Sequence, residues 1–372
     1  MTSVQMHFIV LQHGYHGTEK DMDCLYNRLM THAGNTAQSD HLTFVLNSNV
    51  NHGLKTDQGV LVCARRLVEY VTTEVTERVQ RYEYKHVEVK NTDDSGGLNL
   101  SLRFSFVGHS MGGLIIRAAL PPLVEYLQSA YEGNPEAPHI HLAEEGKVVL
   151  DTFYSIAVPH LGVAHMPSLL KASLGRQGGR LLSQGLYDMN LESTVVTEEL
   201  VQPRYTDYLT RFRRRVLFSA TNDDTVMGYS SVFGLNQKEV DIFNSRGEPT
   251  EGTVLLPSEP ASTLEELKQR KVTITRDVLD RWPAALLPKE RALAARLLPA
   301  ITPAELHTVD LQKRASDYVS THRLSFFERM RVHFAANNFA HRALVAKTPA
   351  AYPDIFGFVS QYIQEDVLNA QS

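Results

Sequence analysis

Short apolar runs alternate with longer amphipathic segments through the first 160 residues of the chain. The apolar runs have the length of strands, and the segments between them carry apolar residues at helical spacing. Strands as apolar as these are buried on both faces, which a parallel sheet covered by crossover helices provides. The alternation therefore predicts an α/β fold with a mostly parallel central sheet and helices on both faces.

The expected elements can be given by residue range. Strands are predicted at 7–12, 42–47, 102–108, 152–158, 214–221 and 329–336. Helices are predicted at 18–30, directly after Gly59, at 111–128 and at 354–363. Residues 81–100 end in the polar sequence NTDDSGG, which favours a surface loop or excursion between a helix and a strand.

A proline-rich stretch at 236–320 interrupts the alternation. It is too long for a plain loop, so we predict a single domain over 1–372 with an inserted helical cap or lid subdomain at 236–320. Within it, residues 282–301 combine apolar with basic residues. We expect this segment to form an amphipathic helix with its apolar side over the pocket and its basic side toward a lipid interface. An extra helix that seals the core is the alternative.

Composition restricts the classes of function. The 372 residues carry a net charge of −5 and no long basic run, which argues against a nucleic-acid partner. The two cysteines, Cys24 and Cys63, lie in helix-like stretches and are expected to be buried free thiols in a reducing compartment. The first residues lack the basic region of a signal peptide, and no window has the apolar length of a membrane span. We therefore expect a soluble, cytoplasmic protein without a transmembrane segment.

The sequence FSFVGHSMGGLIIRAAL (104–120) carries the motif with the clearest chemistry. Gly108, Ser110 and Gly112 form a Gly-x-Ser-x-Gly motif where a predicted strand becomes a predicted helix. In that context the serine lies on a strained turn that lifts its Oγ above the sheet, and the small neighbours let the backbone pass. The following helix directs its first amides at a developing oxyanion. Ser110 is therefore predicted to be a nucleophile rather than a residue of an ordinary turn.

The sequence VLQHGYHG predicts a second donor for an oxyanion hole. His13 and Gly14 directly follow the first predicted strand, where a His-Gly turn directs a backbone amide toward the nucleophile. Tyr15 would then supply one amide, and Met111, the residue after the serine, the other. The alternative is an ordinary turn at the end of a strand.

The acid and the base are expected later in the chain, in the order Ser, Asp, His. Asp223 and Asp224 follow a predicted strand, and Asp223 is preferred because hydrolases often use Asp-x-x-Val there, with Val226 packing under the loop. His341 is preferred as the base because it lies beyond the carboxyl end of a strand, where catalytic loops gather. His333 lies within that strand and is expected to pack against the sheet.

With these motifs the chain resembles the putative serine esterases of the α/β-hydrolase fold, a family that includes yeast lipase-like phospholipases. The resemblance covers most of the chain, and its elements are LQHGYHGTEKDM, SNVNHGLKTDQGVLVCARRLVEYV, FVGHSMGGLIIRAAL, YSIAVPHLGV, FSATNDDTVM and VHFAANNFAHRALV. It implies a catalytic triad of Ser110, Asp223 and His341. The sequence VPHLGV is distinctive of the family, and its His160 is expected to be structural or to line the site.

The sequence thus predicts a serine hydrolase that cleaves carboxylic esters through an acyl-enzyme, with lipid esters of the lipase, phospholipase or lysophospholipase type as substrates. A non-catalytic binding protein of the same fold, or a thioesterase or amidase with the same triad, remains the alternative. No cofactor or metal is expected, because the histidines show no metal-ligand spacing with a nearby acid. The expected partner is a lipid or ester substrate, and peripheral contact with a membrane or lipid-droplet surface stays open.

Overall fold

A mixed sheet organises the part of the chain that the structure describes. The computed structural model describes residues 2–33, 41–89, 98–132, 140–143, 147–160, 162–163, 183–191, 193–220, 226, 272–278, 327–334, 340–345 and 357–369. The strands are β1 (Thr2–Gln12), β2 (His41–Asn47), β3 (Leu98–His109), β4 (Ile140–Leu142), β5 (Val149–Ile156), β6 (Arg214–Ala220), β7 (Val272–Val278) and β8 (Phe327–Phe334). Their order is β2-β1-β3-β5-β6-β8-β7, with β4 beside β3. All of these strand pairs are parallel except β7 with β8, which confirms the mostly parallel α/β sheet.

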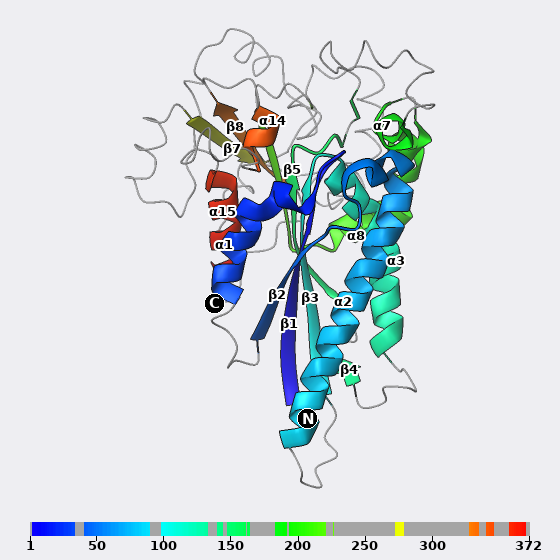
Figure 1. The fold of residues 1–372 in the computed structure, drawn as a ribbon, viewed down its shortest axis with the longest axis vertical. Helices are drawn as coiled ribbons and strands as arrows, with labels where there is room; N and C mark the ends of the chain where they lie inside the picture. Colours follow the sequence, from blue (N-terminus) through cyan, green and yellow to red (C-terminus); the bar gives the residue numbers. More distant parts are fainter. Residues whose placement is uncertain are drawn as a thin grey trace, which may run out of the picture.

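Helices cover both faces of this sheet. They are α1 (Asp23–Ala33), α2 (Val60–Val89), α3 (Met111–Tyr131), α7 (Gln184–Asp188), α8 (Pro203–Thr210), α14 (Ala340–Ala343) and α15 (Gly357–Asn369), with short turns η1 (Glu19–Met22), η3 (Gly53–Gln58) and η4 (Val195–Glu199). Figure 1 shows α1 and α15 on one side of the strands, and α2, α3 and α8 on the other. The predicted α/β architecture with helices on both faces of the sheet is therefore confirmed.

The alternation of side chains along β1 creates two separate cores. Phe8 and Val10 pack with α2 and α3, whereas Ile9 and Leu11 pack with α1 and α15. Successive side chains of a strand point to opposite faces, so an uninterrupted apolar run such as FIVL requires cover on both. Burial of each such side chain contributes about 1.5–3 kcal/mol to the free energy of folding.

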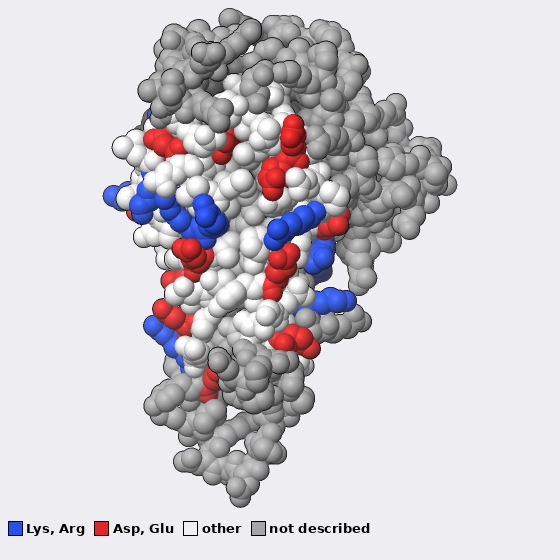
Figure 2. All heavy atoms as spheres, turned by 90° about the vertical axis from the view of Figure 1, so that its right-hand side faces the viewer, with Lys and Arg blue, Asp and Glu red and all other residues white. Residues whose placement is uncertain are grey.

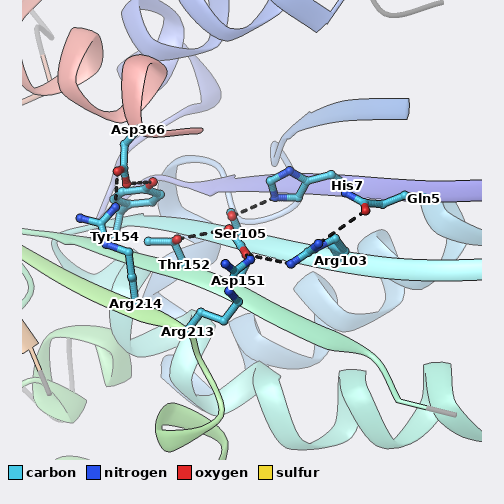
Figure 3. A network of polar contacts seen from close by, with 10 residues as sticks. All are labelled: Gln5, His7, Arg103, Ser105, Asp151, Thr152, Tyr154, Arg213, Arg214 and Asp366. Carbon is cyan, nitrogen blue, oxygen red and sulfur yellow. Dashed lines mark hydrogen bonds and ion pairs between the residues drawn. The ribbon is translucent and has the colours of Figure 1, made fainter. Parts of the chain in front are cut away.

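A group of polar side chains lies on β1, β3 and β5, away from the ends that carry the proposed chemistry (Figure 3). His7 Nε2 lies 2.9 Å from Ser105 Oγ, and the Asp151 carboxylate accepts a hydrogen bond of 2.9 Å from Arg213 and one of 3.4 Å from Arg103. Burial lowers the pKa of His7 to about 4, against the opposing effect of the nearby Asp151. His7 is therefore neutral at physiological pH.

Helix α15 is tied to the sheet by one carboxylate. Asp366 accepts a 2.5 Å hydrogen bond from the Tyr154 hydroxyl and forms an ion pair with Arg214 (Figure 3). Ile363, one turn earlier, is fully buried against the sheet. The helix nearest the end of the chain is thus held by both polar and apolar contacts to β5 and β6.

Two predicted elements differ from the structure. Helix α2 continues to Val89, so residues 81–89 are helical rather than part of a surface loop. Val71, Val75 and Val79 are all buried, and the half-buried Tyr82 packs against the same core, so the buried face of the helix continues past residue 81. Residues 272–278, VTITRDV, form β7 inside the stretch where only helical pieces were expected, although their β-branched residues favour a strand. The rest of 236–320 lies outside the described residues, so the helical cap stays a prediction.

The cysteines and the surface agree with the composition in part. Cys63 is buried, but Cys24 is only half-buried, and neither forms a disulfide. On the face in Figure 2, basic and acidic side chains are interspersed among the described residues, so this face presents no field of a single sign. None of the described helices has the length and hydropathy needed to cross a membrane.

Candidate active site

Ser110 lies between the last residue of β3 and the first residue of α3, as the motif predicts. Its backbone has φ 53° and ψ −130°, a strained conformation that non-glycine residues rarely adopt. The turn is held by a 2.8 Å hydrogen bond from the Ser110 amide to the carbonyl of Ile156 on β5. The strand, strained serine and helix therefore have the arrangement that presents a nucleophile at the end of a sheet.

Two glycines allow the neighbouring backbone to approach this turn. A Cβ on Gly112 would lie 2.2 Å from the carbonyl oxygen of Gln12, and a Cβ on Gly14 would lie 2.6 Å from Ser110 Cβ. A Cβ on Gly108 would likewise meet the backbone of Gly113 at 2.5 Å. The end of β1 consequently packs directly on the first turn of α3, which brings the His-Gly turn beside the serine.

The His-Gly turn is itself well fixed. His13 is fully buried, and its Nδ1 donates a 3.0 Å hydrogen bond to the carbonyl of Gly14. Burial lowers the pKa of His13, so the ring is neutral and shapes the turn without adding charge. The Gly14 carbonyl also accepts the Gly17 amide at 3.1 Å.

Two amides remain available at this turn. Met111 is the first residue of α3, and its amide has no acceptor within the helix. Tyr15 follows Gly14, which lies against the serine. Among the described residues, neither the Tyr15 amide nor the Met111 amide donates a hydrogen bond to another backbone carbonyl. Both amides are therefore in the part of the molecule where an oxyanion hole is expected.

His341 lies next to the motif although it is far away in the sequence. It is the second residue of the short helix α14, not of a loop as expected, and it is 6% exposed. Its ring centroid is 4.7 Å from that of His109, and His109 Nε2 donates a 3.2 Å hydrogen bond to the His341 carbonyl. The structure thus brings His341 against the residue that precedes Ser110.

The other residues considered for the triad are only partly placed. His333 lies within β8, paired with Thr273 of β7, as expected for a strand residue. Asp223 and Asp224 lie outside the described residues, so the choice between them stays a prediction. Val226, expected to pack beneath their loop, is 2% exposed.

His160 belongs to a buried network that the sequence did not reveal. Arg117 Nη1 lies 3.3 Å from His160 Nδ1, and His160 Nε2 lies 2.7 Å from Ser155 Oγ. Because a guanidinium can only donate, Nδ1 accepts and the ring proton is on Nε2, which donates to Ser155. Burial and the adjacent Arg117 hold the pKa of His160 well below its usual value. These contacts favour the structural role over the lining of the site.

Arg117 is the central member of that network. It is 1% exposed, and its Nη2 donates a 2.8 Å hydrogen bond to the carbonyl of Leu200. Burial lowers its pKa to about 10, so it is still charged at neutral pH. The available signal was a single arginine inside the apolar helix sequence LIIRAAL, which indicates a buried cation with specific acceptors.

No group of His, Cys, Asp and Glu side chains among the described residues could hold a metal ion. Three non-glycine residues with positive φ, His16, Ser110 and Ala157, follow β1, β3 and β5 respectively. Strained backbone of this kind concentrates at functional sites. The carboxyl ends of these three adjacent strands are therefore the candidate active site.

The comparisons with known proteins identify the family of the chain. Residues 2–237 match the model of the family described as "Putative serine esterase (DUF676)", so this chain belongs to that family and to the class of ester hydrolases. No curated protein matches the sequence. The family match confirms the resemblance drawn from the motifs.

Several solved structures are similar to the chain. Aspergillus fumigatus lipase B is 12% identical with a TM-score of 0.35, over 61% of this chain and 41% of that protein. Legionella pneumophila phospholipase PlaB is 14% identical with a TM-score of 0.32, over 59% of this chain and 39% of that protein. The peroxisomal α/β-hydrolase Lpx1 of Saccharomyces cerevisiae is 12% identical with a TM-score of 0.32, over 86% and 85% of the two chains. The chain thus spans about two fifths of the first two proteins.

Proposed function

We propose that this protein hydrolyses carboxylic esters of lipids, as a lipase, phospholipase or lysophospholipase does, through a triad of Ser110, His341 and Asp223. The observation that carries the proposal is the strained Ser110 between β3 and α3, with Gly14 packed against it and His341 against its neighbour His109. The membership in a serine esterase family supports the reaction class. The lipid nature of the substrate is proposed from the sequence resemblance and from the predicted amphipathic segment 282–301.

The proposed reaction has two halves. Ser110 Oγ attacks the ester carbonyl while His341 takes its proton, and the negative charge moves to the carbonyl oxygen. The amides of Tyr15 and Met111 stabilise that oxyanion, and Asp223 orients the imidazole and stabilises its charged form. His341 then gives the proton to the departing alcohol, which leaves an acyl-enzyme. Water, activated by the same histidine, releases the acid and restores the serine.

Labelling with a fluorophosphonate tests the reaction class in one step. The probe should attach covalently to the wild-type protein, with the modified peptide containing Ser110, and should not attach to Ser110→Ala. A panel of esters with different chain lengths and headgroups then tests the substrate class, with long-chain lipid esters expected to be the best substrates. Absence of labelling in folded wild-type protein would favour a non-catalytic binding protein of the same fold, and faster turnover of thioesters or amides would correct the substrate class.

A further inference from the structure

The loop that carries the proposed oxyanion donor is bound to a second segment by a single carboxylate. The Tyr15 hydroxyl donates a 2.6 Å hydrogen bond to Asp57 Oδ1. His16 Nε2 lies 2.9 Å from both Oδ1 and Oδ2 of the same residue, and because a carboxylate only accepts, Nε2 carries the hydrogen. Asp57, in η3, therefore holds two consecutive side chains of the loop.

The backbone of the loop is docked on the same turn. The His16 amide donates to Thr56 Oγ1 at 3.0 Å, and the Gly53 amide donates to the Gly17 carbonyl at 2.7 Å. Thr56 Oγ1 in turn donates to the carbonyl of Gly53 at 2.8 Å. The loop and η3, about 40 residues apart in the chain, thus form one hydrogen-bonded unit.

The residue that contacts both carboxylate oxygens of Asp57 is also the strained residue of the loop. His16 has φ 50°, a left-handed conformation that a histidine adopts only where its surroundings over-determine it. The rings of Tyr15 and His16 are stacked with centroids 4.0 Å apart, so the two side chains act together. Their shared bonds to Asp57 supply the constraint.

The charge of Asp57 suits this role. Burial acts to raise its pKa, but hydrogen bonds from Ser183, Tyr15 and His16 outweigh burial and lower the pKa below its usual value. Burial together with the bond to Asp57 raises the pKa of the Tyr15 hydroxyl to about 12, so that hydroxyl remains a donor. At neutral pH the Asp57 carboxylate is therefore charged and the Tyr15 hydroxyl is protonated, as their hydrogen bond requires.

We infer that Asp57 is a positioning residue of the oxyanion hole: it holds Tyr15 and His16 so that the Tyr15 amide stays directed at the carbonyl oxygen of an ester at Ser110. The inference rests on the proposed function. Because Gly14 lies in van der Waals contact with Ser110, any relaxation of the loop displaces the Tyr15 amide relative to the nucleophile. A displacement of about 1 Å at a reacting centre reduces the rate about a hundredfold.

Asp57→Asn tests this assignment, because the amide keeps one acceptor oxygen but loses the charge and the second acceptor. For a short p-nitrophenyl ester, kcat should fall between about tenfold and a hundredfold with KM changed less than about twofold, as expected for an interaction made only in the transition state. Affinity for an alkyl boronic acid, which forms a tetrahedral anionic adduct with the serine, should fall by the same factor. Affinity for an uncleavable ether analogue of the ester should not change.

Asp188→Asn is the matched control. Asp188 is a buried carboxylate beside the same segment, and it accepts a 2.8 Å hydrogen bond from the amide of Val60 at the start of α2 and another from Gln184. Among the described residues, these hydrogen bonds lead to α2 and α7 and not to the oxyanion loop. Its substitution should lower the melting temperature while kcat of the folded protein stays within about twofold of wild type. A structural role for Asp57 predicts the same pattern for Asp57→Asn, with boronate affinity unchanged, and that result would overturn the assignment.

Tyr15→Phe and His16→Gln provide a second route in case Asp57→Asn does not fold. Each should lower kcat. The double variant with Tyr15→Phe and Asp57→Asn should have the same kcat as Asp57→Asn alone, because the two substitutions remove the same hydrogen bond. Full kcat in both single variants would also refute the proposal. If Ser110→Ala loses esterase activity while Asp57→Asn keeps full activity, only the positioning role of Asp57 is refuted. If the wild-type protein itself is inactive toward esters, the proposed function is refuted.

Discussion

The sheet interior and the carboxyl ends of its strands both bring serine and histidine together, but in different ways. In the interior, His7 Nε2 lies 2.9 Å from Ser105 Oγ, and His160 Nε2 lies 2.7 Å from Ser155 Oγ. Both serines lie within strands, Ser105 in β3 and Ser155 in β5. Ser110, five residues beyond Ser105, instead has φ 53° and directly precedes helix α3.

If Ser110 is the nucleophile, as we propose, a short serine–histidine distance does not by itself define one. His160 donates its only ring proton to Ser155, so it cannot accept the serine proton at the same time. His7 is a poor base because burial lowers its pKa to about 4. The backbone amides of a central strand donate hydrogen bonds to the neighbouring strands. The first amides of a helix have no acceptor within the helix and are therefore available to an oxyanion. In the proposed mechanism, the reactivity of the serine therefore depends on the backbone around it more than on its distance from a histidine.

The largest expected effect comes from removing each serine in turn. Ser110→Ala should lower kcat for a p-nitrophenyl ester by about six orders of magnitude, the scale measured for triad removal in a serine protease. Ser105→Ala, which removes a serine already hydrogen-bonded to a histidine, should leave kcat within about threefold of wild type. If Ser110→Ala retains more than about a tenth of wild-type activity, the nucleophile lies elsewhere, since that loss corresponds to less than about 1.4 kcal/mol.

A similar contrast is expected between the two histidines considered as the base. His341→Ala should lower kcat by about as much as loss of the serine, because the members of a triad act as a unit. His333→Ala should mainly lower the melting temperature, because this residue lies in the ladder between β7 and β8. Thermal unfolding and kcat measured on the same samples separate the two effects. If His333→Ala is as stable as wild type but inactive, His333 rather than His341 is the base.

The acid should show a smaller but still large contrast. Asp223→Asn should lower kcat by about four orders of magnitude, because a neutral amide favours the wrong tautomer of the histidine. Asp224→Asn should cost less than about tenfold, and kcat values of the two purified variants decide between them. Equal losses would count against the preference for Asp223.

The smallest expected effect is on the stability of the fold, through the buried pair of His7 and Ser105. The pKa of His7 is about 4 in the folded protein and about 6.5 when unfolded, so the unfolded chain binds more protons between these values. Stability is therefore full above about pH 6.5 and falls as the pH drops toward 4, by up to about 3 kcal/mol from this residue. Urea unfolding at several pH values should show this loss.

His7→Asn should flatten that pH dependence, because asparagine keeps a polar contact for Ser105 without taking up a proton. His52→Asn is the matched control, since His52 is exposed and its substitution should leave the slope as in wild type. An unchanged slope in His7→Asn would show that other groups, such as the buried His13 and His160, cause the acid sensitivity.

Local sequence was sufficient to predict the elements that have a periodic apolar pattern or a turn that requires small residues. The apolar runs located β2, β5, β6 and β8 within three residues of their observed bounds, because strands buried on both faces are rich in apolar residues. Strands β1 and β3 begin five and four residues before their predicted starts, where polar residues such as Gln5 and Ser101 interrupt the apolar pattern. The motif around Ser110 located the strained turn, because small residues are needed wherever backbones pass at the distances seen at Gly112. The carboxyl ends of parallel strands meet at one edge, which is why residues after β1 and β3 could be expected together.

Only the tertiary structure decided the contacts between distant residues. The sequence by itself determined the α/β alternation, the serine turn and the candidates for the triad. It did not indicate the bond of Tyr15 to Asp57, 42 residues away, or that of Arg117 to His160, 43 residues away. It did not show that His341 packs against His109 across 232 residues. Periodicity and motif spacing record which side chains share a face or a turn of their own element. Which polar groups of different elements meet depends on how those elements pack, and that is set by the burial of both faces of the sheet together.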